Sequence, residues 1–227
     1  MRKAAAWLKQ TLDCEFANED LLQRALTHRS AAGENNERLE FLGDAFLNFA
    51  IARRLYDLRP LDAEGDLSRL RAYLVRGTML AELARGLGLD QQLIVGPGEL
   101  RAGGARRETV LANGLEALIG GILLDGGTAA ADGCIDRLFA TRLAALPVAD
   151  TLKDPKTRLQ EWLQGRGCGL PEYTVESAVG EAHKQTFTVV CSEPNGGRSS
   201  RGRGTSRRKA EQDAAQQLLD SLIGAHD

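Results

Sequence analysis

The spacing of apolar side chains changes once along the chain, near residue 146. Before that point, leucine, alanine and other apolar residues recur every three to four positions, as on the buried face of an amphipathic helix. We expect Asn18 to cap one such helix, which begins at residue 19. A Gly- and Arg-rich stretch, residues 96–108, interrupts the pattern, which then resumes as far as Leu146. Residues 1–146 are therefore predicted to form an all-α domain.

The remainder of the chain has a mixed pattern. Residues 147–154 are expected to form a linker, because prolines and acids are concentrated around them. Beyond the linker, helical patterns flank two segments that alternate like strands, at residues 173–178 and 186–192. Residues 198–203 can be interpreted as a weak third strand or as a loop, and a turn-rich loop is expected over residues 202–207. We predict a small α+β domain of order α-β-β-β-α over residues 155–225.

The charge of the chain is uneven, although its net value is only −2. Residues 198–209 contain six basic side chains and no acid. Such a cluster beside an otherwise balanced fold favours a polyanionic partner, and a solvated basic loop is the alternative interpretation.

The four cysteines, Cys14, Cys134, Cys168 and Cys191, are widely separated and form no CxxC motif. Reduced thiols in a cytoplasmic protein are the simplest interpretation. No run of 18 apolar residues is present, so we expect no membrane partner. Nothing in the sequence calls for a small-molecule cofactor.

The segment NERLEFLGD, residues 36–44, carries the clearest chemical signal. Glu37, Glu40 and Asp44 are spaced so that their carboxylates share one face of a helix. The intervening residues are apolar enough to bury the rest of that helix, so the acids border a core and require partners. Hard divalent cations would satisfy them. From spacing alone, a solvated acidic face explains the pattern as well.

A second polar pair lies in the apolar segment VLANGLEALIGGILL. Asn113 and Glu116 are three residues apart and therefore share a helix face. Two helices that offer oxygen ligands and no histidine suit Mg²⁺ or Mn²⁺ better than zinc. Such ions coordinate phosphate oxygens and activate water, which is the chemistry that nucleases use.

Near the C-terminus, the sequence GRGTSRRKAE places Arg207, Arg208 and Lys209 in the first turn of a predicted helix. The helix dipole disfavours three cations at that end, which weakens the interpretation as plain surface charge. Backbone amides and cations at a helix start are well suited to phosphate groups.

These motifs together resemble the bacterial ribonuclease III family. NERLEFLGD resembles the family's signature motif, and residues 153–223 resemble a double-stranded-RNA-binding domain. The resemblance covers nearly the whole chain in one order. The supporting stretches are LTHRS at 26–30, EGDLSRLRA at 64–72, LANGLEALIGGILLD at 111–125, TRLQEWLQ at 157–164, GEAHKQTF at 180–187 and the loop and helix at 202–211.

The resemblance implies a homodimeric endoribonuclease that hydrolyses double-stranded RNA with Mg²⁺, for which Mn²⁺ would substitute. It implies 5′-phosphate and 3′-hydroxyl ends with short 3′ overhangs, and a part in rRNA and mRNA processing. Phe41 and Leu42 resemble residues at the subunit interface, although either could belong to the core of one chain. The implied catalytic residues are Asp44, Glu116, Glu37 and Glu64, and the implied metal ligands are Glu40, Asp44, Asn113 and Glu116.

The resemblance also implies an RNA-contacting set. Gln160, Gln164 and His183 match positions that contact the minor groove, and the cations at 207–209 match positions on the intervening phosphates. Arg106 and Arg107 could clamp RNA near the cleavage centre. His28 has no such match, and we expect it to be an ordinary packed or surface residue.

Position 113 departs from the family pattern, which usually has Asp there. An amide oxygen can coordinate Mg²⁺ but adds no negative charge. Asn113 can be interpreted as a tolerated variant, an engineered change or a cause of impaired cleavage. The other acids are intact, which favours the first interpretation. The alternative function is a regulator that binds double-stranded RNA with impaired cleavage.

Overall fold

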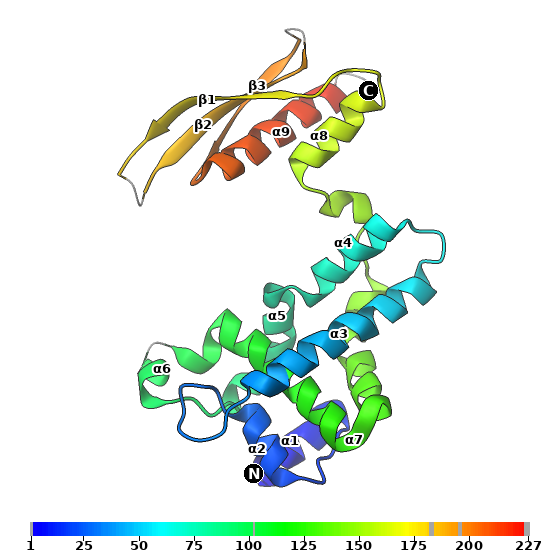
Figure 1. Ribbon diagram of the computed structural model, residues 1–227, viewed down its shortest axis with the longest axis vertical. Helices are drawn as coiled ribbons and strands as arrows, with labels where there is room; N and C mark the ends of the chain where they lie inside the picture. Colours follow the sequence, from blue (N-terminus) through cyan, green and yellow to red (C-terminus); the bar gives the residue numbers. More distant parts are fainter. Residues whose placement is uncertain (1, 102, 182–183, 195–196, 225–227) are drawn as a thin grey trace. The chain divides into compact units, whose positions relative to one another are not determined.

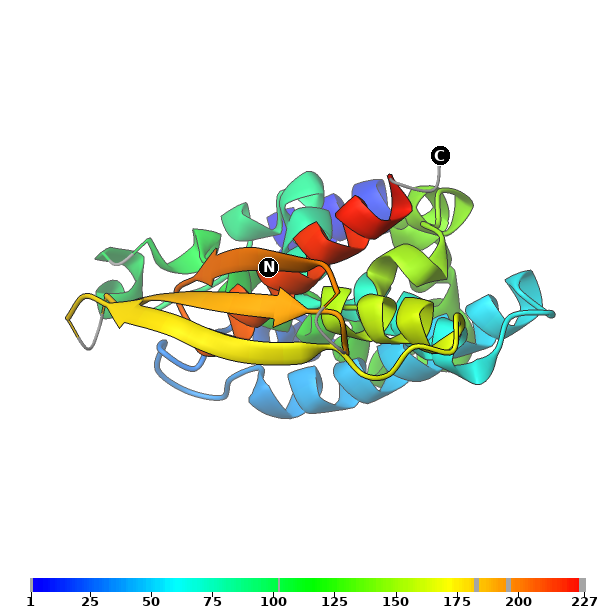
Figure 2. The same cartoon turned by 90° about the horizontal axis from the view of Figure 1, so that it is seen from above.

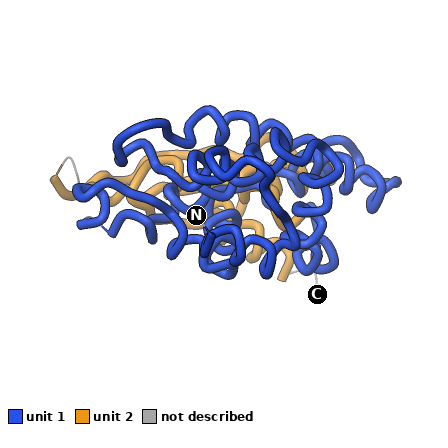
Figure 3. The backbone as a smooth tube through the Cα atoms, turned by 90° about the horizontal axis from the view of Figure 1, so that it is seen from below, with its two compact units in different colours: residues 1–149 blue, residues 150–227 orange. Residues whose placement is uncertain are grey.

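The computed structural model describes residues 2–101, 103–181, 184–194 and 197–224. The chain divides into two compact units, residues 1–149 and residues 150–227 (Figure 3). The division falls within the segment expected to be a linker, and each unit is described by itself.

The first unit is built from helices, with no strand longer than an isolated bridge among its described residues. The all-α prediction for this part of the chain is confirmed (Figure 1). Its α-helices are α1 (Arg2–Leu12), α2 (Glu19–Leu26), α3 (Glu37–Leu58), α4 (Glu64–Val75), α5 (Gly77–Leu87), α6 (Pro97–Arg101) and α7 (Glu108–Ala144). Short 3₁₀ turns at Leu89–Gln91 and Gly104–Arg106 flank α6.

The start of α2 is fixed by side chains from two parts of the unit. The Asn18 side chain accepts hydrogen bonds from the backbone amides of Asp20 and Leu21, which confirms the predicted N-cap. The carboxylate of Asp125 accepts hydrogen bonds from the amides of Ala17 and Asn18 at 2.6 and 3.0 Å. The α1–α2 loop is therefore held against α7.

Helices α3 and α7 cross at the centre of the unit, where two glycines allow their backbones to touch (Figure 1). A Cβ atom on Gly43 would overlap the carbonyl of Glu116. A Cβ atom on Gly120 would overlap the carbonyl of Leu39. Because any side chain at either position would push the helices apart, this crossing depends on glycine on both sides.

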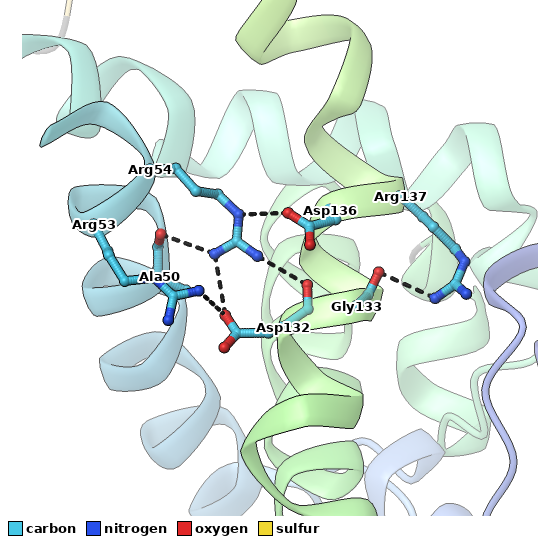
Figure 4. A network of polar contacts seen from close by, with 7 residues as sticks. All are labelled: Ala50, Arg53, Arg54, Asp132, Gly133, Asp136 and Arg137. Atoms are coloured by element: carbon cyan, nitrogen blue, oxygen red, sulfur yellow. Dashed lines mark hydrogen bonds and ion pairs between the residues drawn. The ribbon is translucent and has the colours of Figure 1, made fainter. Parts of the chain in front are cut away.

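Helix α7 is two helical segments joined at Gly127, whose φ of 75° is one that glycine adopts readily. Figure 4 shows how α3 reaches the second segment. The Arg54 guanidinium donates hydrogen bonds to Asp136 at 2.7 Å and to Asp132 at 3.1 Å. Arg54 is only 9% exposed, and the two aspartates neutralise its buried charge. Helix α3 thus contacts both segments of α7.

By length and composition alone, α7 is apolar enough to cross a membrane. Most of its apolar window is buried inside the unit, as in the core helix of a globular domain. Its hydrophobicity is therefore explained by packing.

The second unit is an α-β-β-β-α domain, as predicted. Its three strands are antiparallel and lie side by side in chain order (Figure 2). Side chains from both helices and the central strand form one apolar core, which includes Leu159, Cys191 and Leu218. The elements are α8 (Pro155–Gln164), β1 (Glu172–Val179), β2 (Thr186–Ser192), β3 (Ser199–Gly204) and α9 (Arg207–Ile223).

The third strand settles the alternative that the sequence left open at residues 198–203. The expected loop over residues 202–207 is wrong in extent, because β3 continues to Gly204. A Cβ atom at Gly202 would overlap the backbone of α9 at Ala214. These glycines therefore let a strand pack closely on a helix, where the sequence pattern indicated a turn.

We expect Gly43→Ala to destabilise the chain by roughly 1–3 kcal/mol, because the added methyl group forces α3 away from α7. Gly86→Ala in α5 is the matched control, since a Cβ atom there meets nothing within 4 Å. The control should be neutral or stabilising by up to about 1 kcal/mol. Urea unfolding measures both changes, and equal effects of the two substitutions would contradict the proposed role of the crossing.

Candidate active site and RNA-binding surface

A polar cleft of about 990 Å³ opens beside the crossing of α3 and α7. It contains five of the acids and amides singled out in the sequence. Its lining consists of His28, Arg29, Ser30, Asn35, Asn36, Glu37, Glu40, Phe41, Asp44, Glu99, Arg107, Thr109, Val110, Asn113 and Glu116.

Helix α3 supplies Glu37, Glu40 and Asp44 from one face, as their spacing predicts. The Asn35 side chain accepts a hydrogen bond from the Glu37 amide at 3.0 Å, which fixes the start of α3. Asp44 accepts a hydrogen bond from Asn48 at 2.8 Å, and Glu37 lies 3.5 Å from the Arg29 guanidinium. Glu40 is half-buried between them.

Asn113 and Glu116 face these acids from α7. Burial raises the pKa of Glu116 to about 7, and the charges of Asp44 and Glu40 add to the effect. Burial also raises the pKa of Glu40, whereas a hydrogen bond from the Asn113 amide opposes the rise. The cleft therefore concentrates negative charge that its own side chains only partly compensate.

The chemistry of this donor set fits a hard divalent cation. Three carboxylates and one amide oxygen line the same cleft, and a cation would favour the charged form of Glu116, which burial and the neighbouring charges disfavour. As they stand, no three His, Cys, Asp or Glu side chains of the described residues are close enough to hold an ion.

Two of the site residues predicted in the first unit lie outside this cleft. Glu64 is exposed at the start of α4, where it accepts a hydrogen bond from Ser68 at 2.8 Å. Arg106 is 86% exposed and lies 3.8 Å from Asp90. Arg107 does line the cleft, where it forms an ion pair with Glu99 at 2.9 Å.

Sequence reasoning missed the loop after α2, which forms one wall of the cleft. His28 and Arg29 line the cleft, whereas we expected His28 to be an ordinary residue. The loop is held by Ser30, whose hydroxyl lies 2.8 Å from His28 Nδ1 and accepts a hydrogen bond from the Gly96 amide at 2.9 Å. The motif LTHRS contains these residues and could have indicated their role, but the periodicity of a sequence does not predict where a loop folds.

The second unit presents polar and basic side chains on its two helices. Gln160 and Gln164 are exposed and one turn apart on α8. At the start of α9, the Ser206 side chain accepts a hydrogen bond from the Lys209 amide, and the three predicted cations are exposed. His183 lies outside the described residues.

Glu211 connects the two helices of this unit. Its carboxylate accepts hydrogen bonds from Lys156 at 2.7 Å on α8 and from Arg207 at 2.8 Å on α9. The hydrogen bond from Lys156 is the main cause that lowers the pKa of Glu211. This pairing holds the first turn of α8 beside the first turn of α9.

A helical unit with an oxygen-lined acidic cleft, followed by a unit with amides and cations on two helices, defines an enzyme that acts on nucleic acid. Comparison with known families agrees. Residues 18–143 match the family described as Ribonuclease-III-like, and residues 155–222 match the Double-stranded RNA binding motif. The chain belongs to the ribonuclease III family. It is an endoribonuclease for double-stranded RNA, as the resemblance implied.

Relatives of known name and structure support this assignment. The chain is 52% identical to Ribonuclease 3 of Vibrio vulnificus strain YJ016 over 215 residues, which are 95% of this chain and 96% of that protein. Identity to Ribonuclease 3 of strain CMCP6 is 51% with the same coverage. The nuclease domain of the Campylobacter jejuni enzyme superposes with a TM-score of 0.60 at 39% identity, covering 64% of this chain and 99% of that one. A second structure of that domain gives 0.59 at 40% identity, covering 61% and 98%.

We expect Glu211→Gln to destabilise the second unit at pH 7 by roughly 1–2 kcal/mol, because two charge-assisted hydrogen bonds are weakened. The pKa of Glu211 is lowered from its ordinary value of 4.5 in the folded chain. The contribution is therefore present above that value and is lost as the pH falls through the lowered pKa.

Thermal unfolding of the full chain between pH 7 and about pH 2.5 tests this prediction. The original chain and the variant should converge at the acidic end. Glu172→Gln, at an exposed glutamate on β1, is the control and should show little difference at any pH. A Glu211→Gln defect that did not change with pH would contradict the role of the ion pairs.

Proposed function

We propose that this chain cleaves double-stranded RNA with Mg²⁺ held by Glu40, Asp44, Asn113 and Glu116, with Mn²⁺ able to substitute. The observation that carries this proposal is that these four side chains, from two crossing helices, line one cleft. When bound, the cation would stabilise charge at the scissile phosphate and lower the pKa of the attacking water. The products would carry 5′-phosphate and 3′-hydroxyl ends with short 3′ overhangs.

The protein side chains would contribute charge, orientation and proton control. With a pKa of about 7, Glu116 would hold a proton for part of the time near neutral pH, and a bound cation would favour its charged form. Asn48 orients Asp44, and Asn113 orients Glu40 through its amide. Asp44 and Glu116 would act as the central catalytic acids. The amides of Asn48 and Asn113 are neutral, so these two partners leave the negative charges of Asp44 and Glu40 in place.

Glu37 and Glu64 would be supporting acids, in different ways. Glu37 lies within the cleft beside Arg29, where it can act on the same site. Glu64 lies outside the cleft of its own chain, so a part in cleavage requires RNA or a second subunit to bring it there.

A homodimer is supported by one face of α3. Phe49 and Tyr56 are one heptad apart on this helix, and 62% and 72% of their surfaces are exposed. Phe41, two turns earlier, is 78% exposed at the rim of the cleft. Exposed aromatic residues along one face mark a contact surface. One of the Campylobacter jejuni structures is described as showing flexibility in a region involved in dimer formation. Leu42 is half-buried and belongs partly to the core.

RNA binding would use both units. On the second unit, Gln160 and Gln164 would contact the minor groove, and the three cations of α9 would contact phosphates, as in shape-based recognition of duplex RNA. All three cations are exposed and could reach phosphates, and Arg207 also forms an ion pair with Glu211. Arg107 at the cleft and the exposed Arg106 would add contacts near the cleavage centre. We place this activity in the cytoplasm, in rRNA and mRNA processing.

Asn113 favours one alternative, a duplex-binding regulator with impaired cleavage. A labelled RNA duplex incubated with the full chain over a Mg²⁺ titration separates the two functions. We expect metal-dependent cleavage, and we expect Asn113→Asp to lower the half-saturating Mg²⁺ concentration by about tenfold, equivalent to roughly 1.4 kcal/mol.

Glu116→Gln is the matched control in this experiment. It should bind the duplex as well as the original chain and reduce cleavage by roughly 100-fold or more, because the cation's contribution is lost. Binding by the original chain without cleavage at saturating Mg²⁺ would establish the regulator instead. Equal Mg²⁺ requirements for the original chain and the Asn113→Asp variant would show that the amide does not limit the site.

The proposed interface predicts that Phe49→Glu disrupts the dimer, because the charge must be desolvated at the contact. Sedimentation velocity should show a dimer for the original chain and a folded monomer for the variant. Leu124→Glu, at a residue that is 59% exposed on α7, is the control and should remain dimeric. A Phe49→Glu chain that is still dimeric would place the interface elsewhere.

A further inference from the structure

Two cysteines that are far apart in the sequence meet in the first unit. Cys14 follows α1 in the loop held against α7, and Cys134 lies on the second segment of α7. Cys14 lines a pocket with Gly133 and Arg137, which flank Cys134 on α7, and the neighbouring Asp13 forms an ion pair with Arg137, so the two thiols lie close together. The exposed fractions are 6% for Cys14 and 0% for Cys134, and both thiols are free. Nothing in the nuclease chemistry uses this pair.

A small pocket gives access to one of the two sulfurs. It has a volume of about 280 Å³ and is lined by residues of the loop and of α7, including Cys14, Gly133 and Arg137. Arg137 forms an ion pair with Asp13 at 3.0 Å, which places a cation beside the thiol. Cys134 is not part of this lining, so an entering molecule meets Cys14 first.

We propose that Cys14 and Cys134 form a dithiol site that reacts with hydroperoxides and closes to an intramolecular disulfide. The Cys14 sulfur would attack the terminal peroxide oxygen, forming an S–O bond as the O–O bond breaks. The alcohol or water that leaves takes up the thiol proton. The Cys134 sulfur would then attack the Cys14 sulfenic acid, so that an S–S bond forms, the S–O bond breaks and water leaves with the Cys134 proton.

The surroundings of the two sulfurs assign these separate roles. The hydrogen bond from Cys134 is the main cause that lowers the pKa of Cys14 to about 7, and the Arg137 charge adds to it. The same contact and burial raise the pKa of Cys134. Cys14 is therefore the reactive thiol, and Cys134 is the resolving thiol that waits as a neutral donor.

The other two cysteines lack this arrangement. Cys168 is exposed, with its sulfur near the Arg166 carbonyl, and Cys191 is buried in the core of the second unit beside Tyr173. Burial raises the pKa of Cys191, which makes its thiol less reactive. Exposure alone would favour oxidation of Cys168, so its reaction distinguishes a simple exposed thiol from a paired site.

The disulfide would tie the α1–α2 loop to the second segment of α7. It would close a loop of 121 residues, from 14 to 134, that contains every carboxylate of the candidate active site. Cross-linking such a long loop restricts the unfolded chain strongly. Oxidation is therefore expected to stabilise the nuclease unit without touching the cleft.

The test treats the reduced full chain with hydrogen peroxide and digests it with trypsin without reduction. Cys14 and Cys134 fall in the tryptic peptides 10–24 and 108–137. We expect these peptides to appear as one cross-linked species that dithiothreitol separates. The thermal midpoint of the nuclease unit should rise on the order of 10 °C on oxidation and return on reduction.

Three variants complete the test. Cys134→Ser should give no cross-link and should accumulate Cys14 sulfenic acid that dimedone traps. Cys134→Ala repeats this measurement if circular dichroism shows that the serine variant is unfolded. Cys168→Ser should still form the cross-link. The proposal is overturned if Cys14 and Cys134 stay reduced while Cys168 is oxidised, or if Cys14 joins any other cysteine.

Discussion

The backbone contact between α3 and α7 at Gly43 and Gly120 is the constraint on which the rest of the nuclease unit depends. Gly43 directly precedes Asp44 and touches the carbonyl of Glu116, so the contact lies between two proposed catalytic acids. The separation of the two backbones here is set by main-chain atoms, and the positions of the carboxylates depend also on their side-chain rotamers. The Arg54 pairs with Asp132 and Asp136 then fix the angle of α3 against the second segment of α7.

Placing several acids in one cleft is electrostatically unfavourable, because their negative charges repel one another. The raised pKa of Glu116 reflects this in part: burial is its main cause, and the charges of Asp44 and Glu40 add to it. An aspartate at position 113 would add another negative charge to this cluster. Asn113 instead gives a hydrogen bond to Glu40, so the amide eases repulsion before a cation arrives. The same amide is expected to weaken attraction for the cation, so this one residue lowers both the repulsion among the acids and their affinity for the cation.

How much the sequence predicted depended on whether the cause was local. The all-α unit, the α-β-β-β-α unit, the Asn18 cap and the shared face of Glu37, Glu40 and Asp44 follow from periodicity and capping. The glycine crossing and the Cys14–Cys134 contact join residues far apart, and no pattern within one helix reveals them. The sequence predicted a turn at the end of β3 because glycine is typical both of turns and of close packing. At Gly202 the glycine allows close packing against α9. Cleft membership of His28 and Arg29 depended on how a loop folds.

The main-chain nature of the helix crossing has a consequence for the history of such enzymes. Where side chains set the geometry of a site, changing one ligand shifts its neighbours, and a lineage can lose activity in a single step. Here the close contact between α3 and α7 is made at Gly43 and Gly120 and does not involve the side chain at position 113. Ligands can then be exchanged one at a time, each judged by its own chemistry. Under the proposed function, Asn113 would be one such exchanged ligand on a helix crossing that the exchange leaves in place.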